Sequence, residues 1–471
     1  MNKSAKTGWW VAHLWVLALG VAGVALTAVI DASSILALGA ALSCAVIIRA
    51  SLSRLARAYV AYIILGLVVA PRFAIIPNAN LDRTQFLASL WIFAVCLGGV
   101  VSSRTSRSSP RFRAAVYGRR ITPAVFVAIL SLLAEYALVA RGSFGVAGQY
   151  ATGDSGGGYL GLLVQIGPPS AAGALLATLG RPTRTTNDLF VPAALVALQA
   201  VALTFSGFRG AAPLYVLAVA LCSFRPAASK LRAPLGRRVI VGTTLICFVG
   251  ALFLHGASVR QSAATAAGST APHISLSNAL PTVVQRFDES TYLARADESR
   301  DLPAVKEAVS LRNQLGAIVP RFLYPSKGNI DYGQQMSIAV YGAPANTRNS
   351  STVTTFGDAI INVGLPGGFV LVAIYYFLVD AVFRRMRKAA TVRALSVRVA
   401  LVTAALNLEA PAGLNLVGIL RVSITIVVAQ WLVARAFTPL ADRRRDVADR
   451  AWPSGRLQPT TRDRTAPDAS A

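Results

Sequence analysis

Long apolar runs separated by short polar segments dominate the pattern of hydrophobic and polar positions along this chain. Runs of about 20 apolar residues have the length that a helix needs to cross the hydrocarbon core of a bilayer. The pattern predicts an all-α integral membrane protein with about twelve transmembrane helices. The predicted helices span residues 9–30, 33–48, 58–76, 85–101, 121–140, 159–179, 189–205, 211–224, 239–254, 356–383, 395–408 and 416–437.

Positive charge sets the predicted orientation of these helices. The chain of 471 residues has a formal net charge of +26, although 54% of its residues are hydrophobic and only 14% are charged. The arginines and lysines are concentrated in alternate loops, as in the cytoplasmic loops of membrane proteins, and residues 102–120 carry six arginines and no acid. We therefore expect both termini in the cytoplasm, and we attribute the charge to orientation rather than to nucleic-acid binding.

The largest polar segment, residues 256–355, is predicted to be an extracytoplasmic loop domain between the ninth and tenth helices. It has seven acids against nine bases and so lacks the basic bias of the cytoplasmic loops. Residues 1–255 are predicted to hold helices one to nine, and residues 356–437 helices ten to twelve. Residues 438–471 are rich in arginine, aspartate and proline and poor in apolar residues, which predicts a disordered cytoplasmic tail.

Cysteine and histidine usage predicts neither a metal site nor a disulfide framework. The four cysteines lie in or beside apolar runs, and the three histidines are scattered along the chain. The chain also has no Walker A sequence, no HExxH and no aspartate-rich pair for a metal-bound diphosphate. We therefore expect a function that needs no metal and no cofactor.

Arg209 is the strongest single candidate for a functional residue. It lies in a predicted outer turn, Ser206–Gly210, between the seventh and eighth helices, where cationic loop residues are disfavoured. Glycines at 207 and 210 allow close approach of a ligand to the backbone, and a guanidinium can bind phosphate oxygens in a bidentate manner. The alternative is an arginine that extends to the lipid headgroups.

Three further cations lie in the predicted outer segment. Arg321 and Lys327 are in the sequence IVPRFLYPSK, in which prolines and aromatic residues predict a rigid, packed loop. Such a loop can hold a cation above the membrane surface, and Arg348 follows it on the same segment. The alternative for each of these residues is a solvated charge without a function.

Asp358 and Asn362 are spaced four residues apart and are predicted to share one face of the tenth helix, near its outer end. A carboxylate at this position can act as a general base or orient a sugar hydroxyl. The alternative for Asp358 is a helix cap, because Thr355 and Asp358 have the spacing of a capping box.

Several ionisable residues lie within or beside the apolar runs, where charge is costly and often functional. Arg421, about one turn inside the twelfth helix, is the best of these candidates. Asp380 is expected to pair with Arg384, and Glu135 with Arg141 or another helix. The remaining two, Arg72 and Glu409, lie toward the predicted outer side.

Three motifs resemble those of the bacterial O-antigen polymerases, which join lipid-linked oligosaccharide repeat units. They are SGFRG at 206–210, IVPRFLYPSK at 318–327, and STVTTFGDAIINVGLPGG at 351–368. The resemblance also includes the layout of twelve helices with a large loop between the ninth and tenth.

The resemblance implies a metal-independent glycosyltransferase of the GT-C type without a cofactor. Its substrates would be undecaprenyl-diphosphate-linked oligosaccharides at the outer face of the bacterial cytoplasmic membrane, and its partners the membrane lipids and other polysaccharide export and assembly proteins. Arg209, Arg321 and Asp358 would be catalytic. The substrate-binding residues would be Lys327, Arg348, Asn362 and Arg421.

Three alternatives to a polymerase remain open. The related O-antigen ligases share the layout but usually carry a histidine at the entry to the helix after the large loop, and here the nearest, His273, lies far upstream. A lipid-linked oligosaccharide flippase is disfavoured by the single large outer segment and by the lack of detectable repeats. The third alternative is a non-enzymatic scaffold of envelope synthesis.

Overall fold

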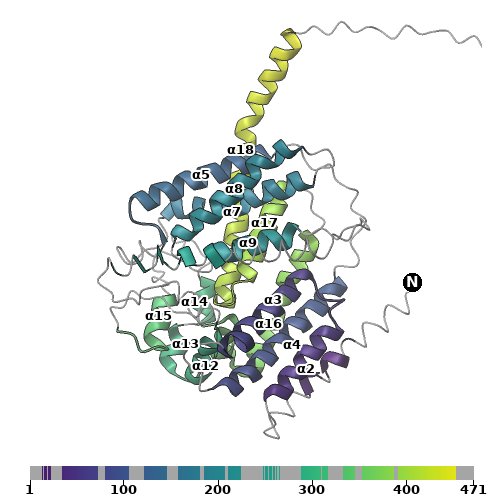
Figure 1. Ribbon diagram of the computed structural model, residues 1–471, viewed down its shortest axis with the longest axis vertical. Coiled ribbons are helices and arrows are strands. Elements are labelled where there is room, and N and C mark those ends of the chain that lie inside the picture. The colour runs from purple at the N-terminus through teal and green to yellow at the C-terminus, as the bar shows by residue number, and fades with distance from the viewer. Residues whose placement is uncertain are drawn as a thin grey trace, which may run out of the picture.

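The computed structural model is built of helices throughout the part of the chain that it describes (Figure 1). The described segments are residues 34–72, 80–105, 121–145, 158–180, 185–206, 211–223, 288–308, 310–316, 332–344, 353–386 and 391–451, with separate positions in 13–22 and 248–265.

Seven helices in these segments are long and apolar enough to cross a membrane. They are the continuous run from α3 through η2 (Arg54–Arg72), α4 (Leu81–Thr105), α5 (Thr122–Ala140), α7 (Gly158–Leu179), α8 (Thr186–Phe205), α16 (Thr355–Met386) and α18 (Ala412–Ala451). This confirms an all-α, multi-pass membrane protein. The count of twelve helices and their orientation stay predictions, and the predicted helices 9–30 and 239–254 lie mostly outside the described residues.

Three shorter helices match further predicted crossings. They are α2 (Ser34–Ile47), α9 (Ala211–Ser223) and α17 (Val392–Ala405). At the C-terminal end, α18 continues past residue 437, where the prediction ended it, and reaches Ala451. The first part of the predicted disordered tail is therefore helical in this structure.

The long helices form two neighbouring groups (Figure 1). In one group α4 packs between α2 and α16, and in the other α7 packs against α5, α8 and α17. The helices α4 and α16 approach closely because of Gly98, where an added Cβ would lie 2.6 Å from the carbonyl oxygen of Ala373. At one end of this pair Arg384 forms an ion pair of 2.6 Å with Asp380, which confirms the predicted pairing.

The tenth helix was predicted to be continuous over residues 356–383. This prediction is wrong, because α16 breaks at Gly364. This residue has φ 73° and ψ 175°, a backbone conformation that only glycine adopts readily. A Cβ added to Gly368 would lie 3.0 Å from the backbone nitrogen of Ile360. Positions eight residues apart in a straight helix are about 12 Å apart along its axis. The two parts, residues 355–363 (the first arm) and 365–386 (the second arm), are therefore folded back on each other.

An aromatic cluster shows the same reversal. The ring of Trp91 on α4 lies 5.7 Å from that of Phe356 in the first arm and 6.0 Å from that of Tyr59. Tyr59 in turn lies 4.2 Å from Tyr376 in the second arm. In a straight helix Phe356 and Tyr376 would be about 30 Å apart. The fold-back therefore carries the start of α16, with its polar residues, into the interior of the helix bundle.

The predicted outer segment packs on this region through four short helices. They are α12 (Ser290–Ser299), α13 (Pro303–Ala308), α14 (Leu311–Gly316) and α15 (Tyr332–Ala339). The helices α12 and α13 contact α16, and α14 contacts α18. The segment also hydrogen bonds to the π-helical turn η1 (Leu65–Val69), which follows α3 (Arg54–Ile64). There the N–H of Glu289 donates to the carbonyl of Gly66, 3.0 Å away. The described part of the segment is thus packed against the helix bundle.

Candidate functional site

The start of the first arm is capped by Thr354. Its hydroxyl accepts a hydrogen bond of 3.0 Å from the N–H of Gly357. The predicted capping box between Thr355 and Asp358 is therefore wrong. Thr355 instead donates its hydroxyl to the carbonyl of Ala410, 2.7 Å away, in the connection between α17 and α18. The carboxylate of Asp358 is thereby left available for long-range contacts.

The carboxylate of Asp358 is fully buried where the outer segment meets α16. Its Oδ1 accepts hydrogen bonds from Gln314 Nε2 on α14, at 2.7 Å, and from the Tyr332 hydroxyl on α15, at 3.0 Å. The backbone amide of Ala412, the first residue of α18, also faces the carboxylate. Its Oδ2 has no hydrogen-bond partner of normal geometry among the described residues. Asp358 therefore connects the outer segment with two membrane helices, and one of its buried oxygens is not used in these contacts.

Tyr332 is a permanent donor to this carboxylate. Burial and then the adjacent charge of Asp358 raise the pKa of the Tyr332 phenol well above its ordinary value. The phenol therefore stays protonated at any physiological pH and remains a hydrogen-bond donor toward Asp358.

Asn362 lies on the same face as Asp358, as its spacing predicted. Its Nδ2 donates to the backbone carbonyl of Asp358 at 2.9 Å and to the carboxylate Oδ1 at 3.3 Å. Its Oδ1 accepts a hydrogen bond of 2.7 Å from the N–H of Leu311, at the start of α14. Asn362 is half-buried and also forms part of the wall of a pocket, so it connects this pocket with Asp358.

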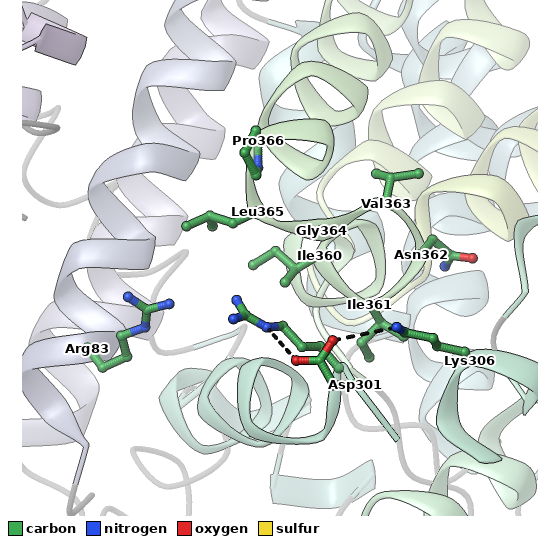
Figure 2. A pocket seen from close by; sticks show the side chains of 11 residues that line it. Arg83, Asp301, Lys306, Ile360, Ile361, Asn362, Val363, Gly364, Leu365 and Pro366 are labelled. Atoms are coloured by element: carbon green, nitrogen blue, oxygen red, sulfur yellow. Dashed lines mark hydrogen bonds and ion pairs between the residues drawn. The ribbon is translucent and has the colours of Figure 1, made fainter. Parts of the chain in front are cut away.

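The pocket has a volume of about 580 Å³ and lies at the break in α16 (Figure 2). Residues 360–366 of α16 form one wall. Arg83 faces this wall from α4, and Lys306 lies on the opposite side of the view, with Asp301 between them (Figure 2). Arg300 is the third cation of the lining. The break in α16, one membrane helix and the outer segment therefore all contribute to the pocket.

The cations of the pocket exceed its acids. Arg83 and Arg300 share Asp297, at N–O distances of 2.7 Å and 3.1 Å. Asp301 lies 3.4 Å from Arg300 and 3.5 Å from Lys306. Three positive charges thus face two negative charges, which favours an anionic ligand.

Sequence reasoning missed Arg83, Arg300 and Lys306 as candidate residues. A signal was present for Arg83, because it lies on the predicted outer side, where cations in short loops are disfavoured; the same argument identified Arg209. Glu289 was also missed. It is fully buried beside the π-helical turn η1, and a buried carboxylate in a membrane protein is a functional candidate.

The structure does not bring Arg421 to Asp358. Arg421 lies nine residues beyond Ala412 on α18, roughly 13 Å along the helix. Its guanidinium donates to the side-chain oxygen of Gln165 on α7 at 2.9 Å. The remaining predicted cations, Arg209, Arg321, Lys327 and Arg348, lie outside the described residues.

Two further candidates within the apolar runs have different surroundings. Glu135 is buried in α5 and forms no ion pair with Arg141, so that predicted pairing is wrong; its polar neighbour is Ser131, one turn earlier. Arg72 is exposed at the end of η2.

Metal ligands are not clustered in the described segments, since no group of three or more histidine, cysteine, aspartate or glutamate side chains could hold a metal ion there. Comparison of the chain with protein-family models, with curated proteins and with solved structures found no match.

Proposed function

We propose that this protein polymerises lipid-diphosphate-linked oligosaccharide repeat units at the outer face of the bacterial cytoplasmic membrane. The observation that supports the proposal best is the junction around Asp358. There a buried carboxylate adjoins a pocket with excess positive charge, at the meeting point of a polar segment and the bundle. A glycosyltransferase for lipid-linked substrates needs these two elements together, a proton acceptor and cations for a diphosphate leaving group.

The proposed reaction is a single glycosyl transfer. The hydroxyl of an acceptor repeat unit attacks the anomeric carbon of the growing glycan, and the bond from that carbon to the lipid diphosphate breaks. The leaving diphosphate keeps the electron pair, and cations such as Arg209 and Arg321 stabilise its charge. In this proposal Asp358 takes the hydroxyl proton, and Asn362 on the pocket wall holds the acceptor. Lys327, Arg348 and Arg421 would bind other parts of the substrates.

The test is gel analysis of surface polysaccharide from a deletion strain complemented with matched amounts of each variant. We expect long chains with the wild type and single attached repeat units with Arg209→Ala or Arg321→Ala. Asp358→Asn keeps an oxygen for the donors Gln314 and Tyr332 but cannot take a proton, so it should also stop chain growth. The control is Arg295→Ala, since this arginine is exposed and pairs only at 3.6 Å with Glu298 in the same helix.

Other outcomes would replace the proposal. Polymer that is made but not attached to its final carrier would indicate a ligase, and repeat units that accumulate on the cytoplasmic face would indicate a flippase. Unchanged chains in all the variants would indicate a scaffold without catalytic activity. Full activity of Asp358→Asn alone would remove Asp358 as the proton acceptor and leave it the role of holding the outer segment on α16.

A further inference from the structure

A shallow apolar groove of about 470 Å³ begins at the break in α16 and continues along its second arm. It lies next to the pocket that contains Arg83, Arg300 and Lys306, here called the basic pocket. It is lined by Val363, Pro366, Gly367, Val370, Leu371 and Ile374. Two of these residues, Val363 and Pro366, also line the basic pocket, so the groove and the pocket join at the break in the helix. Pro366 lies at this junction, above Ile360 in the view of Figure 2.

The apolar groove lies on an exposed surface of a helix whose length and composition suit a membrane. It belongs to a helix that is long and apolar enough to span a membrane, and the side chains of Val370 and Ile374 are about half exposed. Because all of its lining residues belong to α16, from Val363 at the break to Ile374 in the second arm, the groove suits one extended hydrocarbon chain. A water-soluble anion would use the basic pocket and leave the groove empty.

The ion pairs of the pocket differ in strength. Asp297 is largely buried and holds Arg83 at 2.7 Å. Asp301 is 81% exposed and contacts Arg300 and Lys306 only at 3.4 Å and 3.5 Å. Exposed ion pairs at such distances contribute little and exchange readily for a better partner. A phosphate can therefore take the place of Asp301 beside Arg300 and Lys306, while Asp297 keeps its contacts with Arg83 and Arg300.

We propose that the basic pocket and the apolar groove together bind one single-chain lipid with a phosphate or diphosphate headgroup. The phosphate contacts Arg300 and Lys306 in place of Asp301, and the chain extends from Pro366 along Val370 and Ile374. This inference rests on the proposed function in one respect, namely that the bound lipid is the carrier of the glycan. It places the headgroup directly beside Asn362, and through it beside Asp358.

The experiment measures binding of farnesyl diphosphate to the purified full-length protein by native mass spectrometry. Farnesol has the chain without the headgroup, and inorganic pyrophosphate has the headgroup without the chain. We expect both to bind at least tenfold more weakly than farnesyl diphosphate. Equal binding of farnesol would overturn the basic part of the site, and equal binding of pyrophosphate would overturn the apolar part.

Substitutions test which residues bind the phosphate of the lipid. Loss of a charged hydrogen bond weakens binding by about tenfold or more, so Arg300→Ala with Lys306→Ala should show at least that loss. Asp301→Asn should strengthen binding about two- to fivefold, because it frees both cations from an exposed ion pair. Arg295→Ala, on α12 five residues before Arg300 but outside the pocket, should leave binding unchanged.

Two results would contradict the proposal. One is equal affinity of the wild type and the Arg300→Ala/Lys306→Ala variant, both folded by their thermal transitions. The other is weaker binding by Asp301→Asn. Gel analysis of surface polysaccharide from strains with the same variants distinguishes a failure of the proposed function from a failure of the proposed lipid site. Phosphate-dependent lipid binding in a protein whose deletion leaves polymer intact would overturn the proposed function only. Loss of polymer in Asp358→Asn without lipid binding at the pocket would overturn only the lipid site.

Discussion

Replacement of Gly364 by alanine tests the break in α16 directly. A Cβ at this position would meet no atom within 4 Å, so the substitution causes no clash. The backbone conformation, φ 73° and ψ 175°, is nevertheless one that residues with a Cβ avoid. A residue held in such a conformation costs about 1–3 kcal/mol. The whole effect of Gly364→Ala is therefore backbone strain, without a change in packing.

Gly418→Ala is the matched control. Gly418 lies inside α18, its added Cβ also meets no atom within 4 Å, and its φ is not positive. Alanine is favoured over glycine in a helix by about 0.5–1 kcal/mol, so this change should stabilise the protein slightly. The two substitutions add the same methyl group and are expected to act in opposite directions.

The assay is thermal unfolding of the full-length protein in lipid nanodiscs, followed by tryptophan fluorescence. At about 2 °C per kcal/mol, Gly364→Ala should lower the Tm by roughly 2–6 °C, while Gly418→Ala should raise it slightly. If α16 were a continuous helix at Gly364, alanine would be favoured there as well. Equal increases in Tm for both variants would therefore refute the fold-back of the first arm onto the second.

Three further substitutions test other contacts of the same region, each by unfolding of the full-length protein. Arg384→Ala leaves the buried carboxylate of Asp380 without its ion pair and should cost roughly 3–5 kcal/mol, whereas Arg384→Leu with Asp380→Leu should recover most of this loss; no recovery in the double variant would contradict the argument. Gly98→Ala should cost about 1–3 kcal/mol, because its Cβ would lie 2.6 Å from the backbone of α16; an unchanged Tm would mean that α4 and α16 are less tightly packed. Tyr332→Phe should cost about 1–3 kcal/mol, because the carboxylate of Asp358 loses one of its buried donors; a neutral result would place the Tyr332 hydroxyl elsewhere.

The candidate site shows which interactions a sequence pattern can anticipate. The spacing of Asp358 and Asn362 predicted a shared face correctly, because four residues make about one helical turn. The donors Gln314 and Tyr332 were not predicted, because they lie 44 and 26 positions from Asp358 in the sequence. The prediction of a capping box was wrong for the same reason. The hydroxyl of Thr355 donates instead to a distant residue, Ala410, in the connection between α17 and α18.

The basic pocket could not be predicted from the sequence either, because its residues are also far apart along the chain. Arg83 contacts Asp297, which lies 214 positions away in the sequence. A local sequence pattern cannot predict a contact between residues so far apart. The positive-inside argument could have singled out Arg83 as an unusual outer cation. It could not have placed Arg300 and Lys306 beside it, because their positions depend on how α12 and α13 pack on α16.

The sequence by itself determined the class of the protein and the approximate bounds of most described membrane helices. Both follow from local quantities, namely the length of each apolar run and the cost of exposing polar backbone to lipid. The tertiary structure alone decided that α16 reverses at Gly364. A glycine two residues before a proline is compatible with either a kink or a straight continuation. The choice depends on the contacts of Gly368 with Ile360 and on the shared aromatic cluster. That long-range packing carries Asp358 into the bundle and places the pocket at the break, where it joins the groove along the second arm.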